Sequence, residues 1–491
     1  MKGPSEIMGR LFISATHKSS GKTTISLGLA AALAARGLAV QTFKKGPDYI
    51  DPMWLARASG RACYNLDFNT QSEAEILGAF RRAAGNADIA LIEGNKGLHD
   101  GLDLEGRDSS ASLAGLLRAP VALVVDTEGM TRGIAPLVLG YAAFDPRVEI
   151  RGVILNKVGL ARQEGKLRQA LERYTDIPVL GAIGRDEGLR VEERHLGLTT
   201  PGESDDALRT IARTRDVVQR GIDIDRLIAV AGAAGNVSGP TPLEACLAPD
   251  LRIAVARDAA FGFYYEDDFE ALRRAGANLI FFDALRDQSL PAADALFIGG
   301  GFPETQAAAL AANAPLRAEI KAAIASGLPT YAECGGLMYL TRSICWRGRT
   351  YEMVGAVPAE TVVGDRPQGR GLVVLEETED APWPGGAEQK AIPAHEFHYA
   401  ALENLDPACR FAYRMRRGYG VDGGRDGIVI GNLLASFSHL RDTSRHHWAR
   451  RFVAFVRQTR ARLGAEPTVG RLAADSSPQR AGAYSARRSA R

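Results

Sequence analysis

Near its start the chain reads Thr16-His-Lys-Ser-Ser-Gly21-Lys22-Thr23-Thr24, directly after the apolar run Leu11–Ser14. A buried strand, a tight glycine turn and a helix in this order form a phosphate-binding loop, because backbone N–H groups and the helix N-terminus converge on an anion. In such loops the glycine allows close approach, the lysine reaches the phosphates and the following hydroxyl binds magnesium. Thr16 stands where the first glycine is usually found. The stretch predicts a nucleotide-binding domain with a parallel sheet, and the residues expected to bind ATP are Ser20, Gly21, Lys22, Thr23 and Thr24.

Apolar runs alternate with helical patterns along the chain and divide it into two α/β units. The predicted strands of the first unit are Leu11–Ser14, Ala39–Phe43, Asp88–Ile92, Val121–Val125 and Gly152–Leu155, and those of the second are Arg252–Ala256, Asn278–Phe282, Ala295–Ile298 and Pro329–Ala332. We expect one domain at residues 1–200, a linker at 201–249, a second domain at 250–460 and a tail at 461–491. The tail has too few large apolar residues to order itself.

Composition narrows the class of protein. The 491 residues are 46% hydrophobic and 24% charged, with a net charge of +2, which gives no bulk reason to expect a nucleic acid or an anionic membrane as partner. No apolar run is long enough to span a bilayer, and the first residues lack a secretion signal. The five cysteines are scattered without metal-ligand spacing, as in proteins of a reducing compartment. We therefore expect a cytoplasmic protein, and its oligomeric state stays open.

Acidic residues follow two further strands of the first unit. Lys45-Gly-Pro-Asp48-Tyr-Ile-Asp51-Pro comes after the second predicted strand, and Glu93 and Asp100 come after the third. Ligands of open α/β sheets bind beyond the carboxyl ends of the strands. Carboxylates beside a bound triphosphate are expected to bind magnesium or to position groups, since they would otherwise repel the phosphates. Asn156, at the end of the strand Gly152–Leu155, is a candidate for reading the nucleotide base.

A cysteine in the second unit stands where a nucleophile needs to be. Cys334 follows the strand Pro329–Ala332 and precedes Gly335-Gly336 and an apolar helical stretch. The glycines permit a sharp turn and bring backbone N–H groups close to the sulfur. A second glycine loop, Gly299-Gly-Gly301, follows the strand Ala295–Ile298. We expect Cys334 to be the nucleophile, and the residues expected to form its oxyanion hole are Gly300, Gly301 and Gly335.

His395, His398 and His439 are the candidate bases for this cysteine. His439 lies just past the apolar stretch Ile428–Ile430 and is favoured, whereas the other two are expected to be structural or to lie at the domain interface. The orienting partner of His439 is open, with Glu396 and Asp442 as possibilities.

Several long motifs resemble the cobyrinate a,c-diamide synthase family over nearly the whole chain except the tail. They are the phosphate loop, the Lys45–Pro52 block, Asn65-Leu-Asp67, Glu93-Gly-Asn-Lys-Gly-Leu-His-Asp-Gly101, Arg257-Asp-Ala-Ala-Phe-Gly-Phe-Tyr-Tyr265, Gly299-Gly-Gly-Phe-Pro-Glu304 and Ala394-His-Glu-Phe-His-Tyr399. The resemblance implies a dethiobiotin synthetase-like P-loop domain followed by a class I, flavodoxin-like glutamine amidotransferase domain.

The resemblance also implies an activity and roles for residues. Family members are carbon–nitrogen ligases that use ATP, Mg²⁺ and glutamine to turn acetate carboxylates of a tetrapyrrole into amides. Asp48, Glu93 and Asp100 would organise magnesium, phosphate and the acceptor carboxylate, with Thr23, Asp48 and Glu93 at the metal and Tyr49 and Ile50 near the substrate. Many relatives with a Cys-His-Glu triad carry glutamate where this chain has Arg441, and the cobyrinate branch commonly lacks it as well.

The loop between Glu93 and Asp100 bears on the choice of macrocycle. Members that act on cobyrinic acid usually have Val, Met and Phe where this chain has Asn95, Lys96 and His99, so an apolar wall becomes polar and cationic. This pattern, followed by Asp126-Thr-Glu-Gly-Met-Thr-Arg-Gly-Ile, resembles a subgroup associated with dissimilatory sulfite reductase that is proposed to amidate siroheme. Siroheme or a close precursor is the favoured substrate, and cobyrinic acid is the alternative.

Two other classes must be weighed against an amidotransferase. A partitioning-type P-loop ATPase that binds DNA or a membrane would leave Cys334 and its glycine turn unexplained. A synthetase that uses only free ammonia would have no need of both Cys334 and His439.

Overall fold

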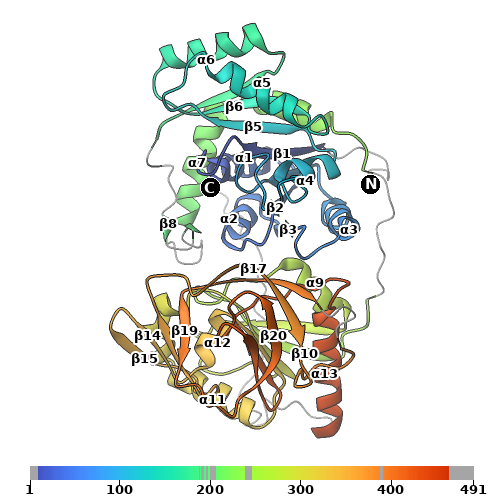
Figure 1. Cartoon of the computed structure of the whole chain (residues 1–491), viewed down its shortest axis with the longest axis vertical. Coiled ribbons are helices and arrows are strands. Elements are labelled where there is room, and N and C mark those ends of the chain that lie inside the picture. The colour runs from blue at the N-terminus through green and yellow to red at the C-terminus, as the bar shows by residue number, and fades with distance from the viewer. Residues whose placement is uncertain are drawn as a thin grey trace, which may run out of the picture.

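The computed structural model describes residues 9–186, 188, 193–194, 197–198, 206–237, 246–386 and 391–463. Within them two α/β lobes lie one above the other, the N-terminal lobe coloured blue to green and the C-terminal lobe yellow-green to red in Figure 1. The predicted tail lies outside the described residues from 464 onward, and so do residues 238–245 of the predicted linker.

The N-terminal lobe is built on a seven-stranded parallel sheet with the order β3-β2-β4-β1-β5-β6-β7. Its strands are β1 Gly9–Ala15, β2 Val40–Lys45, β3 Tyr64–Leu66, β4 Ile89–Glu93, β5 Val121–Asp126, β6 Ile150–Val158 and β7 Val179–Gly184. Its helices are α1 Lys22–Ala35, α2 Ile50–Ser59, α3 Glu73–Ala84, α4 Ser110–Leu116, α5 Ile134–Phe144, α6 Ala161–Tyr174, α7 Ala207–Gly221 and α8 Ile224–Gly232. A two-stranded pair, β8 Glu193–Arg194 and β9 Gly197–Leu198, completes it.

Helices α7 and α8 correct the expected linker. A Cβ on Gly28 of α1 would lie 2.4 Å from Val218 Cγ2, so α7 packs against α1 at van der Waals distance. Ile211, Ile224 and other apolar residues of these helices belong to the same buried cluster as β1 and α1. The polar, glycine-broken sequence around them concealed this amphipathic pair, and residues 206–237 therefore belong to the N-terminal lobe.

The C-terminal lobe has a nine-stranded mixed sheet with the order β11-β10-β12-β13-β22-β21-β20-β17-β18. The first five strands in this order are parallel, namely β11 Ala277–Phe282, β10 Leu251–Ala256, β12 Ala295–Ile298, β13 Thr330–Glu333 and β22 Leu433–Ser436. The other four are antiparallel, namely β21 Arg425–Ile430, β20 Arg410–Arg417, β17 Gly369–Glu377 and β18 Ile392–His398. A four-stranded sheet holds β15 Arg349–Glu352, β14 Ser343–Trp346, β16 Glu360–Val363 and β19 Ala400–Glu403.

The helices of this lobe are α9 Glu266–Arg274, the 3₁₀ turn η2 Pro303–Gln306, α10 Ala307–Ala312, α11 Ala314–Ala325, α12 Gly335–Leu340 and α13 Trp448–Leu463. Charged residues at both ends stabilise α9 through the helix dipole. Its first turn carries Glu266, Asp267 and Asp268, and its last turn carries Arg273 and Arg274.

The carboxyl ends of strands from both lobes face each other. Tyr49, which follows β2, stacks on Phe263, which follows β10, with ring centroids 5.2 Å apart and planes inclined by 4°. Both rings belong to one buried cluster that runs from α1 and α2 of the N-terminal lobe to Tyr265 and Phe302 of the C-terminal lobe. In Figure 1 the segments α2, β3 and α3 form the side of the upper lobe that faces β17 and α9. The two predicted reaction centres therefore meet at one interface.

Candidate active site

The phosphate loop connects β1 to α1 as the sequence predicts. Ser19 and Gly21 have φ values of 66° and 93°, and a Cβ on Gly21 would lie 2.2 Å from Asn156 Nδ2, so only glycine fits there. Asn156 Nδ2 donates to Ser20 O at 2.8 Å, and Lys157 Nζ donates to Ser19 O at 3.0 Å. The amide of Asn156 thus braces the loop, which is a different role from the base contact expected from the sequence.

Behind this loop lies a buried ion network. Thr23 Oγ1 donates to Glu93 Oε1 at 2.8 Å, and Lys44 Nζ lies 2.7 Å from the same oxygen and 2.6 Å from Asp51 Oδ2. Burial alone would lower the pKa of Lys44, but the Asp51 and Glu93 carboxylates outweigh it and raise that pKa. Lys44 is therefore a permanent cation that pairs with two carboxylates beside the nucleotide site.

The network fits a magnesium nucleotide. Glu93 Oε2 is buried without a hydrogen-bond partner, and the Thr23 hydroxyl touches the other oxygen of the same carboxylate. Burial and the neighbouring Lys44 lower the pKa of Lys22 to about 8. The negative charge of a bound polyphosphate would stabilise the protonated form of this lysine. Thr23 and Glu93 would hold the metal, and Lys22 would meet the phosphates.

Asp48 and Asp100 lie in two loops at the same edge of the sheet. Asp48 Oδ1 accepts the backbone N–H of Asp51 at 3.1 Å, and Asp100 Oδ2 accepts that of Gly97 at 3.0 Å. Burial, together with the negative charge of Asp51, raises the pKa of Asp48 to about 7. Ile50 begins α2 directly behind this loop and is buried.

The three polar residues of the Glu93–Asp100 loop point in different directions. Lys96 is exposed and has a φ of 52°, and the Asn95 amide comes near Gly46 of the Asp48 loop. The His99 ring lies against α5 instead, 5.2 Å from the ring of Tyr141 and 4.9 Å from that of Phe144. The structure brings Asn95 and Lys96 to the acidic edge, but it does not bring the His99 ring there.

Cys334 occupies a strained turn between β13 and α12. Its φ and ψ are 47° and −103°, and its N–H donates to Ser436 O at 2.7 Å. A Cβ on Gly335 would lie 2.9 Å from Gly301 N, and a Cβ on Gly336 would lie 2.2 Å from Ile298 O. The two glycine loops thus interlock without room for a side chain, and they bring the expected oxyanion donors of Gly301 and Gly335 together.

His439 lies beside the cysteine and directly over Gly300, whose added Cβ would come within 2.5 Å of His439 Cε1. Its Nδ1 is 3.4 Å from Glu333 Oε2. Burial alone would lower the pKa of His439, yet Cys334 and Glu333 together raise it to about 10. Glu333 is itself fixed, because its Oε1 accepts the Tyr331 hydroxyl at 2.5 Å and the Leu440 N–H at 2.9 Å.

Glu333 replaces the orienting groups considered from the sequence. Glu396 accepts the backbone N–H groups of Tyr419 and Gly420, at 2.7 and 2.8 Å, and Asp442 accepts that of Ala449 at 3.0 Å. Both carboxylates are thus engaged elsewhere. The geometry is that of a Cys-His-Glu triad whose acid directly precedes the nucleophile in the chain.

Comparison with known proteins identifies both halves of this arrangement. Residues 11–198 match the CobQ/CobB/MinD/ParA nucleotide binding domain, and residues 252–446 match the CobB/CobQ-like glutamine amidotransferase domain. Cobyrinate a,c-diamide synthase of Magnetococcus marinus is 46% identical over 91% of this chain and 97% of its own. The protein of the same name from Methanosarcina acetivorans is 42% identical over 88% and 92%. The chain belongs to the cobyrinate a,c-diamide synthase family.

Family membership makes the protein a glutamine-dependent carbon–nitrogen ligase with a nucleotide-binding domain, as the sequence predicted. It removes the partitioning ATPase as an explanation of the chain. Among solved structures, PurLQS from Thermotoga maritima aligns over 43% of this chain and 99% of its own at 17% identity, with a TM-score of 0.33, which is too distant to support an argument. None of the described helices is long and apolar enough to cross a membrane.

An aromatic cover separates the cysteine and histidine from solvent. The rings of Tyr49 and His395 lie 5.1 and 4.8 Å from that of His439, and the Tyr265 hydroxyl is 3.2 Å from His395 Nδ1. Cys334 is 5% exposed and His439 is 2% exposed. Tyr49, predicted to lie near the acceptor, is therefore also part of the glutamine centre. His398 is stacked on Phe437, 4.0 Å between centroids, in the structural role expected.

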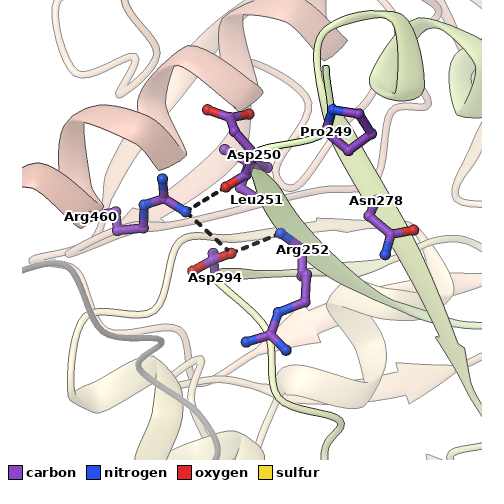
Figure 2. A pocket seen from close by; sticks show the side chains of 7 residues that line it. All are labelled: Pro249, Asp250, Leu251, Arg252, Asn278, Asp294 and Arg460. Atoms are coloured by element: carbon purple, nitrogen blue, oxygen red, sulfur yellow. Dashed lines mark hydrogen bonds and ion pairs between the residues drawn. The ribbon is translucent and has the colours of Figure 1, made fainter. Parts of the chain in front are cut away.

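A surface hollow of about 350 Å³ beside α13 is not part of this site (Figure 2). It lies at the amino ends of β10 and β12, opposite the edge that carries Cys334. Asp294 Oδ2 accepts the Arg252 N–H at 2.7 Å, and Arg460 Nη1 donates to Asp250 O at 2.7 Å. These polar groups are satisfied by one another and hold α13 on the sheet.

Three functional residues were missed from the sequence. Lys44 and Asp51 carry the ion network, and Glu333 faces His439, the candidate base. Asp51 stands within the Lys45–Pro52 block and Glu333 directly precedes Cys334, so adjacency to Asp48 and to Cys334 was the available signal. Their roles depend on side-chain direction, which the motif spacing alone does not specify.

Proposed function

We propose that this protein amidates acetate carboxylates of a tetrapyrrole with ATP and glutamine, and that the macrocycle is siroheme or a close precursor. The observation that carries the choice of macrocycle is the polar, cationic segment Asn95-Lys96, which lies in the loop between Glu93 and Asp100 with the Asn95 amide near Gly46 of the Asp48 loop. Cobyrinic acid, the substrate named for the relatives, is the alternative.

At the glutamine centre the Cys334 sulfur attacks the side-chain amide carbon. The developing oxyanion is stabilised by the N–H groups of the interlocked glycine loops, and His439 gives the departing nitrogen its proton as ammonia leaves. Water, deprotonated by His439, then attacks the thioester and releases glutamate and the thiolate. Glu333 keeps the imidazole oriented and stabilises its positive charge in the steps in which it carries the extra proton.

At the nucleotide centre an acceptor carboxylate oxygen attacks the γ-phosphorus, and ADP leaves. Lys22 pairs with the phosphates, and Asp48 and Asp100 position the acceptor. A magnesium ion at Thr23 and Glu93 would neutralise phosphate charge. Ammonia then attacks the activated acyl carbon, the C–O bond breaks and phosphate departs with its electron pair. Phosphate leaves readily where hydroxide does not, which is why ATP is needed.

The surface beside Asp100 suits a flat macrocycle with apolar faces and an acidic rim. Leu102 is 62% exposed and Leu104 is fully exposed, close in sequence to Asp100. Lys96 is an exposed cation in the same loop. Lys45, whose pKa is lowered by burial, adds a second ammonium group on the neighbouring strand end. Exposed leucines beside lysines complement a ring that bears several carboxylates.

Competition between the two macrocycles tests the proposal. Purified protein is incubated with MgATP and glutamine and with either siroheme or cobyrinic acid, and amide formation is followed by mass spectrometry. We expect amides to form on siroheme or its precursor with a higher kcat/KM than on cobyrinic acid. Amidation of cobyrinic acid alone would contradict the choice of substrate and leave the class of reaction intact.

A further inference from the structure

Arg441 joins the two lobes at the point where the two centres meet. Its Nη2 donates to the backbone carbonyl of Asn65 and to Asp267 Oδ2, both at 2.6 Å, and its Nε reaches the same carboxylate at 3.1 Å. The guanidinium lies 4.7 Å over the Tyr265 ring, and the side chain is 1% exposed. A buried arginine with this many directed contacts is held in one position.

Asn65 extends this contact to the Asp48 loop. Its Nδ2 donates to the backbone carbonyls of Gly46 and Asp48 at 2.8 and 2.7 Å. The loop between β2 and α2 is therefore attached to Arg441 through a single residue. A change in that loop on binding nucleotide or acceptor would reach Arg441 through these bonds.

Tyr49 connects the Asp48 loop to the glutamine centre. It follows Asp48 directly, and its ring lies 5.1 Å from His439, which stands two residues before Arg441. The position where many triad relatives carry an orienting glutamate thus holds a residue that faces the other lobe, while Glu333 faces the histidine. Where those relatives have a glutamate that contacts the histidine, this chain has an arginine that contacts the other lobe.

We propose that Arg441 is a positioning residue that couples the two half-reactions. By holding Asn65 and the Asp48 loop against His439, it keeps Tyr49 over the cysteine and directs ammonia toward the activated acceptor. The coupling rests on the proposed amidation, because ammonia needs an acceptor, but the docking can be measured without one.

The test measures glutamate released per amide formed. Arg441→Met combined with Asp267→Asn removes both members of the buried pair and leaves no unpaired charge. We expect ammonia-dependent amide formation and glutamine hydrolysis to persist, while the ratio of glutamate to amide rises about five-fold or more, the lower range for coupled sites. Arg441→Lys keeps a cation beside Asp267 and is expected to restore part of the coupling.

Arg82→Ala is the matched control, since it removes an interdomain ion pair, Arg82 to Glu270 at 3.5 Å, without touching either loop. Its ratio should stay at the wild-type value. A wild-type ratio in the folded double variant would overturn the proposal, as would a parallel loss of ammonia-dependent synthesis, which would make Arg441 a support of the synthetase loop alone.

Hydrogen exchange separates this proposal from the choice of macrocycle. ATP binding should slow exchange in residues 436–442 of the wild type and leave them unaffected in the double variant. If the wild type amidates neither macrocycle but shows this protection, the proposed substrate fails and the coupling stands. If ATP changes nothing in these residues, the coupling fails whatever macrocycle is accepted.

Discussion

The nucleotide centre and the glutamine centre solve opposite problems. The first concentrates charge, with Lys44 between Asp51 and Glu93 and the Lys22 ammonium nearby. The second excludes solvent, with Tyr49 and His395 stacked around His439 and Cys334 almost fully covered. A polyanionic nucleotide needs fixed ions to meet it, whereas a thioester and free ammonia need protection from water. Tyr49 lies between the two centres, because it follows Asp48 directly in the chain and its ring lies 5.1 Å from that of His439.

Removing the nucleophile should separate the centres most completely. Cys334→Ser is expected to lower glutamine-dependent amide formation by on the order of 10⁴-fold or more, because the triad acts as a unit. Ammonium chloride should restore amide formation, since the nucleotide centre lacks any role for the thiol. Rates with each nitrogen source check this. Loss of the ammonia-dependent reaction as well would show that the centres are not separable.

Removing the Lys44 cation should lower the stability of the fold around the nucleotide centre. Lys44→Met leaves the buried Glu93 and the half-buried Asp51 without their counter-ion, which should cost about 3–5 kcal/mol in the free energy of unfolding. Lys45→Met is the control, because Lys45 is the next residue of the same strand, whereas the counter-ion of Asp51 and Glu93 is Lys44. Urea denaturation of both variants measures the difference. Equal losses of unfolding free energy in the two variants would mean that the ion pairs of Lys44 add no stability beyond that of an ordinary lysine at this strand end.

Glu333→Gln should change the pH dependence of the glutamine centre. The raised pKa of His439, about 10, contributes stability that is fully present below its unfolded value and is lost as pH rises through 10. Without the negative charge this pKa falls, so the alkaline limit of glutamine hydrolysis moves to lower pH and the rate drops by roughly 10²-fold.

Glutamate release measured across pH tests this shift. Glu396→Gln serves as its control, since Glu396 binds the N–H groups of Tyr419 and Gly420 and should leave the alkaline limit where it is. An unshifted profile in Glu333→Gln would argue that another group orients the histidine.

The smallest effect is expected at the loop beside the acceptor. Lys96→Met should raise the KM for the macrocycle by about five-fold, in line with the roughly 1 kcal/mol of an exposed ion pair, with kcat little changed. Lys166→Met, an exposed lysine on α6, is the control. A lower KM for siroheme in the Lys96 variant would contradict the cationic contact.

Prediction from sequence succeeded where a motif combined a strand, a turn and a chemical group. The nine predicted strands overlap β1, β2, β4, β5, β6, β10, β11, β12 and β13, because each is an apolar run and all but the edge strand β11 are covered on both faces. The elbow at Cys334 follows from its glycines. Weaker alternation hid the antiparallel strands β17 to β21, and the polar, glycine-broken sequence around α7 and α8 made them look like a linker.

The direction in which a side chain points could not be predicted from the sequence. Asn156 braces the loop, His99 packs on α5 and Glu333 supplies the orienting carboxylate, all of which depend on tertiary contacts absent from the motif. Arg441 is the clearest case. The sequence showed only a missing glutamate, and the fold shows what the replacement contacts.

Isotope labelling tests the joint action of the two centres most directly. The protein is supplied with MgATP, the accepted macrocycle and glutamine labelled with ¹⁵N in its side-chain amide, in the presence of excess unlabelled ammonium. The account predicts that the macrocycle amide carries ¹⁵N, because the nitrogen passes from Cys334 to the acceptor within the protein. An amide that carries the isotope composition of the bulk ammonium would contradict it.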